Sequence, residues 1–309
     1  YNAVDMLFVG RFTGTESLAA VSVCGPILNV MIITLSGMSA GVLVVISGLL
    51  GAGDIKQAQD AAHTSVALYA LMAAVMTVLG LLFVPQILRL VQTPAAAMPE
   101  AKRYLYTVFA GTVFTFGYNL IGALQRGLGN ATASMSFVII SSAANIALDA
   151  VFIVWLGMGA FGAALGTVLS QVAAFVIGTV QFARGGAALR LSARAVRFHK
   201  KHLKNILLFG VPTALNEVMV NLAMLTVSGV ANSFGLASSA AYGVGSRINS
   251  LAIFTDGAMN QTMSAYASQN IGAGRQKRAL EGLWKAIILS AGAALGTSLL
   301  VLGFASEFS

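Results

Sequence analysis

Charged residues are scarce in this sequence, since only 9% of its 309 residues are Asp, Glu, Lys or Arg. A soluble domain carries about 25% charged residues, which cover its surface with groups that water solvates. With 57% hydrophobic residues in addition, this chain cannot form such a surface. The composition therefore predicts an all-α integral membrane protein that crosses the bilayer with long apolar helices.

Cysteine and the common catalytic patterns are also lacking. Cys24 is the single cysteine, so a disulfide framework is excluded. The sequence shows no Ser/His/Asp arrangement, phosphate-binding loop or zinc ligand set. The glycine pattern at 157–162 follows a membrane helix instead of the strand that a dinucleotide site needs. We therefore expect neither an enzyme nor a bound cofactor, and an ATP-driven pump is not supported.

Long runs poor in charge dominate the chain, and such runs predict membrane-spanning helices when they exceed about 18 residues. We expect about eight full spans and one partial span. Their approximate limits are 1–12 (partial), 17–50, 61–88, 104–125, 131–156, 160–183, 205–232, 238–271 and 286–306.

The segment 184–204 is basic and holds seven of the 18 Lys and Arg residues, with no acid. Cytoplasmic loops are enriched in Lys and Arg, so this segment is predicted to lie in the cytoplasm. Counting helices outward from it places 13 cations inside and five outside. This bias explains the net charge of +8 better than nucleic-acid binding does. We expect His199 and His202 in this segment to be solvated.

An internal repeat relates the two ends of the chain. Residues 14–58 match residues 235–279 without a gap, at an offset of 221, and both stretches contain the phrase Gly-Ala-Gly before a Lys. Transporters are often built from such repeats. We expect two pseudo-symmetric six-helix lobes, with about twelve spans in the natural protein and both ends of this chain truncated. The predicted lobes cover 1–183 and 205–309 (incomplete), joined by the basic segment 184–204.

Acids inside spans are costly to insert and are therefore functional candidates. Asp5, Asp149 and the hydroxyl of Thr167 each lie about nine residues from a predicted outer turn, roughly 13 Å below the surface. Asn145 shares a helix face with Asp149. Together they predict a site for a hard cation such as Na⁺, or for a proton. The alternative is that these groups only tie helices together.

Two further acids, Glu217 and Asp256, are predicted to lie at a common, deeper level of the second lobe. They form either an acid pair there or two solvated groups near the inner interface. Among the glycines, Gly162 and Gly166 have the small-xxx-small spacing that is typical of helix packing in lipid.

Three stretches resemble the multidrug and toxic compound extrusion (MATE) transporters: "VDMLFVGRFTGTESLAAVSV" at 4–23, "NIALDAVFIVWLGMGAFGAALGT" at 145–167 and "SQNIGAGRQKRA" at 268–279. The resemblance implies a twelve-helix exporter of organic cations, driven by entry of Na⁺ or protons. It also implies that the positions matching Asp5, Asn145, Asp149 and Thr167 form the cation site of the first lobe.

These observations together predict a secondary exporter in a bacterial inner membrane. We expect a monomer with small organic cations as cargo, the lipid bilayer as its surroundings and no nucleic-acid partner. A flippase for lipid-linked precursors, from the same superfamily, is the alternative. Such a protein needs cations in its cavity to hold pyrophosphate, whereas the full spans here hold acids and Arg247 is the main cation near a span.

Overall fold

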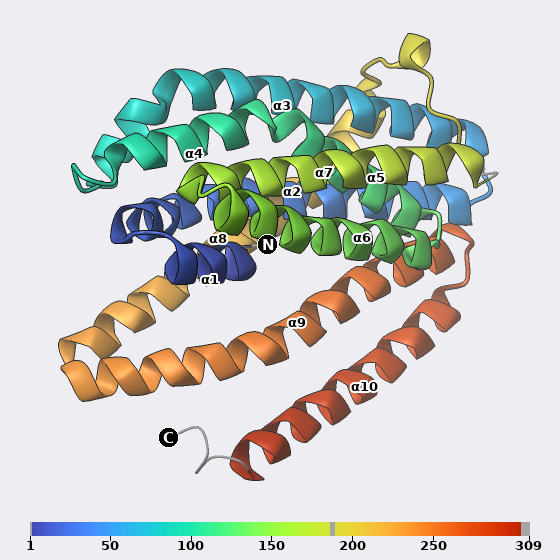
Figure 1. Cartoon of the computed structure of the whole chain (residues 1–309). Helices are drawn as coiled ribbons and strands as arrows, with labels where there is room; N and C mark the ends of the chain where they lie inside the picture. Colours follow the sequence, from blue (N-terminus) through green and yellow to red (C-terminus); the bar gives the residue numbers. More distant parts are fainter. Residues whose placement is uncertain (1, 186–188, 304–309) are drawn as a thin grey trace.

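The computed structural model describes residues 2–185 and 189–303, and all regular structure in these ranges is helical (Figure 1). Side chains at some helical positions, those of Arg247 and Asp256 among them, lie outside the described residues. The all-α prediction is confirmed for the described chain. The elements are α1 Asn2–Phe12, α2 Thr15–Gly51, α3 Ile55–Leu90, α4 Met98–Ala110, α5 Thr112–Gly127, α6 Ala131–Asp149, the π-helix Ala150–Trp155, α7 Gly159–Arg184, the 3-10 helix Ala193–Ala195, α8 Lys200–Ser233, α9 Leu236–Gly272 and α10 Gln276–Gly303.

Six of these helical segments are long and apolar enough to cross a membrane. A seventh span results if α4 and α5, which are bent by 48° at Gly111, are taken as one broken span. The stretch predicted as a single span over 104–125 therefore begins earlier and is broken. The run predicted over 238–271 forms one continuous helix, α9, but this helix is rich in Ser, Asn and Gln and is not among the six. The protein is a multi-pass membrane protein.

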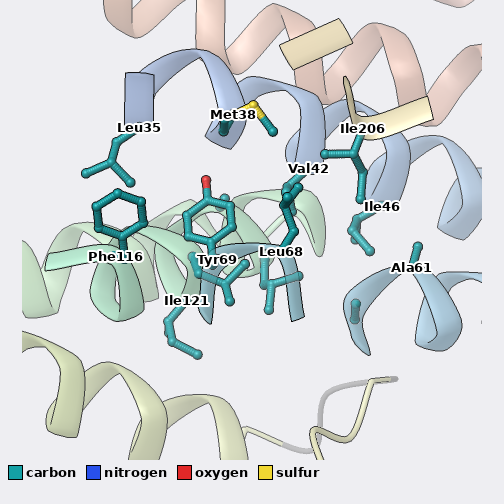
Figure 2. Close-up of a cluster of buried hydrophobic side chains, with 14 of the residues drawn as sticks. Leu35, Met38, Val42, Ile46, Ala61, Leu68, Tyr69, Phe116, Ile121 and Ile206 are labelled. Atoms are coloured by element: carbon teal, nitrogen blue, oxygen red, sulfur yellow. The ribbon is translucent and has the colours of Figure 1, made fainter. Parts of the chain in front are cut away.

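The first seven α-helices pack around two hydrophobic clusters. One cluster joins α2, α3, α5, α6 and α7 and includes Ile206 of α8 (Figure 2). Within it, the hydroxyl of Tyr69 lies 2.9 Å from Oγ of Ser39, so the one polar end of this buried ring is hydrogen-bonded. The other cluster joins α1, α2, α3 and α4 with α7 and the π-helix. Both clusters hold the helices that carry the candidate site in fixed positions.

The internal repeat is visible in the helix limits. Helices α2 and α9 are both 37 residues long, and their first and last residues differ by the same offset of 221 that relates the two sequences. Helices α3 and α10 begin at the same offset, at Ile55 and Gln276. The limits predicted for the lobes themselves, 1–183 and 205–309, stay a prediction.

The two halves of the repeat touch at one end of the molecule. A Cβ atom on Gly51 would overlap the carbonyl oxygen of Gln269, and one on Gly272 would overlap that of Gly48. Because Gln269 is the repeat counterpart of Gly48, and Gly272 that of Gly51, this contact is reciprocal, as in a two-fold interface. Toward the other ends of α8 and α9 the helices diverge from the first lobe (Figure 1). The molecule is therefore closed at the end predicted to be cytoplasmic.

Candidate acid site in the first lobe

Three helices bring the predicted site residues together inside the first lobe. Asp5 comes from α1, Asn145 and Asp149 from α6, and Thr167 from α7. Their exposed fractions are 0%, 1%, 0% and 6%, so all four are buried. Oγ1 of Thr167 donates a hydrogen bond of 3.0 Å to Oδ2 of Asp5. Asp149 is close enough to Asp5 for the two carboxyl groups to interact electrostatically.

Most of the polar atoms in this cluster have no protein partner. Oδ1 of Asp5, both carboxyl oxygens of Asp149 and both amide atoms of Asn145 are buried without a hydrogen bond. Native proteins satisfy the large majority of such atoms. Five unsatisfied atoms on three neighbouring residues therefore indicate a place for a proton or an ion. Because the potential ligands are oxygen atoms, the cluster suits a hard cation such as Na⁺.

A transition-metal centre is not offered by this cluster. Within the described residues, no group of three or more His, Cys, Asp or Glu side chains could hold a metal ion. The two carboxylates and two neutral oxygen donors are all oxygen ligands, and soft metals prefer sulfur and nitrogen. The arrangement can bind one proton between the carboxyl groups or one small cation with help from Asn145 and Thr167.

The backbone around Asp149 departs from ordinary helix geometry. The α-helix ends at Asp149 and continues as the π-helix Ala150–Trp155, in which the N–H of Leu156 bonds to the carbonyl of Val151 at 3.0 Å. Such π segments occur frequently at functional sites. Sequence reasoning did not anticipate it, because the residues "AVFIVW" carry no signal that distinguishes the two helix types.

Gly166 provides the space that the Asp149 carboxylate occupies. A Cβ atom at this position would overlap Oδ1 of Asp149 and would lie 3.5 Å from its Cγ. The sequence pattern predicts only helix packing for this glycine, and the structure shows that the neighbour is a candidate ligand. Gly166 therefore belongs to the site as a residue that positions Asp149.

Glu217, the candidate acid of the second lobe whose side chain the structure describes, has no described hydrogen bond or ion pair to this cluster. Glu217 is half-buried on α8, and its backbone carbonyl accepts a 2.8 Å hydrogen bond from Nδ2 of Asn221. Asn221 in turn lies 3.5 Å from Nδ2 of Asn29 on α2, which is a polar contact between the lobes. Because the side chain of Asp256 is outside the described residues, the pairing of Glu217 with Asp256 stays a prediction.

Two helical lobes that close at one end, with unpaired carboxyl groups buried inside one of them, are typical of secondary transporters. Comparison with known protein families identifies the transporter family. The chain belongs to the MatE family, whose model matches residues 1–151 and 212–308. It is a family of transporters.

Individual relatives agree with this assignment. The chain is 28% identical to the "Probable multidrug resistance protein YpnP" of Bacillus subtilis (strain 168), over 90% of this chain and 62% of that protein. It is 30% identical to the "Probable multidrug resistance protein YoeA" of the same organism, over 91% of this chain and 63% of the relative. The chain thus spans a little under two thirds of the length of these relatives.

A solved structure confirms the fold over the whole chain. The outward-facing conformation of a multidrug resistance MATE family transporter of the MOP superfamily superimposes with a TM-score of 0.91 at 26% identity, covering 100% of this chain and 68% of that chain.

Proposed function

We propose that this chain is the greater part of a multidrug exporter that exchanges an organic cation for Na⁺ or a proton, in the plasma membrane of a bacterium. The observation that carries the proposal is the buried pair Asp5 and Asp149, whose carboxyl oxygens largely lack partners. The relatives named as multidrug resistance proteins support the cargo class. The transporter acts as a monomer and needs no cofactor besides the coupling ion.

The physical basis is the unfavourable energy of two negative charges in a dry site. Removal of two carboxylates from water is costly, and their mutual repulsion adds to that penalty. A single proton or cation relieves both effects, so the pair binds it as a unit. The hydrogen bond from Thr167 orients the Asp5 carboxylate toward this task.

Exchange follows from competition for negative charge. The empty site leaves the first lobe negative and attracts a cationic drug into the opening between the lobes. Entry of the coupling ion from outside neutralises Asp5 and Asp149 and tightens the contacts of α1 with α6 and α7. Both changes lower the affinity for the cationic drug, which leaves outward. The neutral oxygens of Asn145 and Thr167 supply the additional ligands that Na⁺ requires.

Transport of lipid-linked pyrophosphates is less well supported. That activity needs cations between the lobes, whereas the described polar side chains near the contact of α2 with α8 are Glu217, Asn221 and Asn29, and the side chain of Arg247 lies outside the described residues. The carboxylate of Glu217 favours a cationic cargo.

The test uses Asp149→Asn in the complete transporter reconstituted in liposomes, with efflux of a fluorescent organic cation as the readout. Sodium and proton gradients are collapsed separately, which identifies the coupling ion. We expect Asp149→Asn to abolish gradient-driven efflux, and Thr167→Ala to weaken it less because a neutral ligand is lost. Glu16→Gln, at an exposed carboxylate on α2, is the matched control and should transport normally. Ion-triggered drug release that persists in Asp149→Asn would contradict the proposal.

A further inference from the structure

From Leu189 onward, the linker between α7 and α8 lies against α3 instead of extending freely into solvent. Gln59 of α3 holds it by two hydrogen bonds to one residue: Nε2 donates to the carbonyl of Arg190, and Oε1 accepts from the N–H of Arg190 at 2.7 Å. A side-chain amide that pairs with both backbone groups of one residue fixes the orientation of that peptide. Leu189 beside it is only 2% exposed and joins the hydrophobic cluster of the first lobe.

Further contacts continue the attachment along the linker. Nε2 of His63 lies 3.4 Å from the backbone N–H of Ser192 and accepts from it. Oγ1 of Thr64 accepts from the backbone N–H of His199 at 3.2 Å. The expectation that both histidines of the basic segment 184–204 are solvated is wrong for His202, which lies on α8 and is 5% exposed. The backbone of the linker therefore faces α3, and Leu189 is buried.

This attachment leaves the basic side chains on the outer surface. The exposed cations of the linker and of the first two turns of α8 are Arg190, Arg194, Arg197, Lys200, Lys201 and Lys204. Within the described part of the chain none of them has a carboxylate within ion-pair distance. Of two nearby acids, Asp54 accepts hydrogen bonds from Gln57 and is also close enough to Lys201 for their charges to attract, and Asp60 lies 3.8 Å from His199.

The linker joins the ends of two candidate spans, which is where lipid headgroups are expected. It connects Arg184, the last residue of one span, with Lys200, the first residue of another. Phe198, next to Lys200, is 48% exposed, and an aromatic ring flanked by cations suits the boundary between headgroups and acyl chains. Clusters of four to eight cations next to a span attract anionic lipids, at about 1 kcal/mol for each cation near the surface.

We propose that the docked linker, which we call the linker face, is a binding surface for the phosphate headgroups of anionic phospholipids in the cytoplasmic leaflet. The six cations provide the charge. The clamp formed by Gln59, His63 and Thr64 provides preorganisation, because the linker does not have to be ordered again when lipid binds. The linker face thereby anchors the first lobe to one leaflet.

The experiment measures the preference of the full chain, in phosphatidylcholine vesicles, for spin-labelled phosphatidylglycerol over spin-labelled phosphatidylcholine. Arg190, Arg194 and Lys200 are replaced together by Gln, since their side chains make no contact that the clamp needs. We expect the preference to fall about fivefold for each cation that contacts a headgroup. The matched control replaces Arg275, Lys277 and Arg278, which are exposed in the turn before α10 and within its first turn, and removes the same charge.

A variant of the clamp tests whether lipid binding depends on the fixed position of the linker or only on its net charge. Gln59→Ala keeps every cation but removes both hydrogen bonds to Arg190, and we expect it to lower the phosphatidylglycerol preference while the melting temperature in detergent changes little. The proposal is overturned if the linker triple variant keeps its preference, or if the control triple variant loses as much. Displacement of the lipid by inorganic phosphate at equal concentration would assign the face to a soluble anion and would also overturn it.

Discussion

Substitution of Gly166 by Ala is the most direct perturbation of the candidate site that leaves its chemistry intact. No ligand is removed and no charge changes. The added methyl group would overlap Oδ1 of Asp149. To restore an ordinary van der Waals separation of about 3.5 Å, the carboxylate must move by on the order of 1 Å. The Asp149 carboxylate is then displaced relative to that of Asp5, and the geometry in which both bind a single cation is lost.

The magnitude follows from the packing of this region. Inserting one methyl group into a well-packed interior costs about 1–3 kcal/mol. If this strain is concentrated at Asp149, it weakens cation binding by between about fivefold and about 150-fold. The assay is equilibrium binding of radioactive sodium to the purified protein or, for a proton-coupled protein, the pH midpoint of drug release. Drug binding without the coupling ion should change much less.

Gly178→Ala on the same helix is the matched control. A methyl group there would lie 3.2 Å from Ile121 and Phe137, both apolar and remote from the acids. We expect a lower melting temperature with unchanged ion affinity. If Gly166→Ala binds the ion as the unchanged protein does, Asp149 is not a ligand whose position matters, and the reasoning about the site is refuted.

Two further predictions concern the cytoplasmic end of the molecule. Gly272→Ala should favour the state that is open to the cytoplasm, because its methyl group would overlap the carbonyl of Gly48 only while the lobes are closed. Distances between spin labels on the two lobes measure the shift. Gly257→Ala, whose methyl group would have nothing within 4 Å, should leave these distances unchanged. Asp54→Ala should lower the melting temperature at neutral pH, because it removes the acceptor for the backbone N–H of Gln57 at the start of α3. Hydrogen bonds from the backbone N–H and the side chain of Gln57 hold the pKa of Asp54 below its ordinary value of 3.8. The contribution of Asp54 to stability is therefore present above that value and is lost as the pH falls through the lower, folded-state pKa. The melting temperatures of the two proteins should therefore converge below pH 3.8.

Helix composition and the repeat could be predicted from the sequence because both depend on patterns that extend over tens of residues. The offset of 221 relates α2 to α9 residue for residue. The break at Gly111 was not predictable, since one glycine in an apolar run gives no sign of whether the helix continues straight. Sequence reasoning also missed the polar beginning of α3 at Ile55, because a search for charge-poor runs excludes helical turns outside the membrane.

The candidate site was predictable in part for a different reason. Asn145 and Asp149 share a face by their spacing, and counting residues from the outer turns placed Asp5 and Thr167 at the same depth. Which neighbour contacts Gly166 depends on how three helices pack. The small-xxx-small pattern does not tell whether the neighbour of a glycine is the backbone of another helix or, as here, a carboxylate. The docking of the linker on α3 could not be predicted either, because Gln59 and Thr64 form no periodic pattern in the sequence.

Gly48 contacts Gly272 and Gly51 contacts Gln269, so each glycine meets the repeat counterpart of the other. This reciprocal contact has a mechanical consequence. A contact that lies on a pseudo-two-fold axis moves little when the halves rotate about it, so it can serve as a fulcrum. Helices α2 and α9 are 37 residues long and reach about 55 Å from this point. A rotation of about 10° there displaces their far ends by about 10 Å, which is enough to open or close a passage for a drug-sized molecule. Three of the four residues at the fulcrum are glycines, and the fourth, Gln269, is exposed and contacts Gly51 through its backbone, so the two backbones can turn against each other with little repacking of side chains.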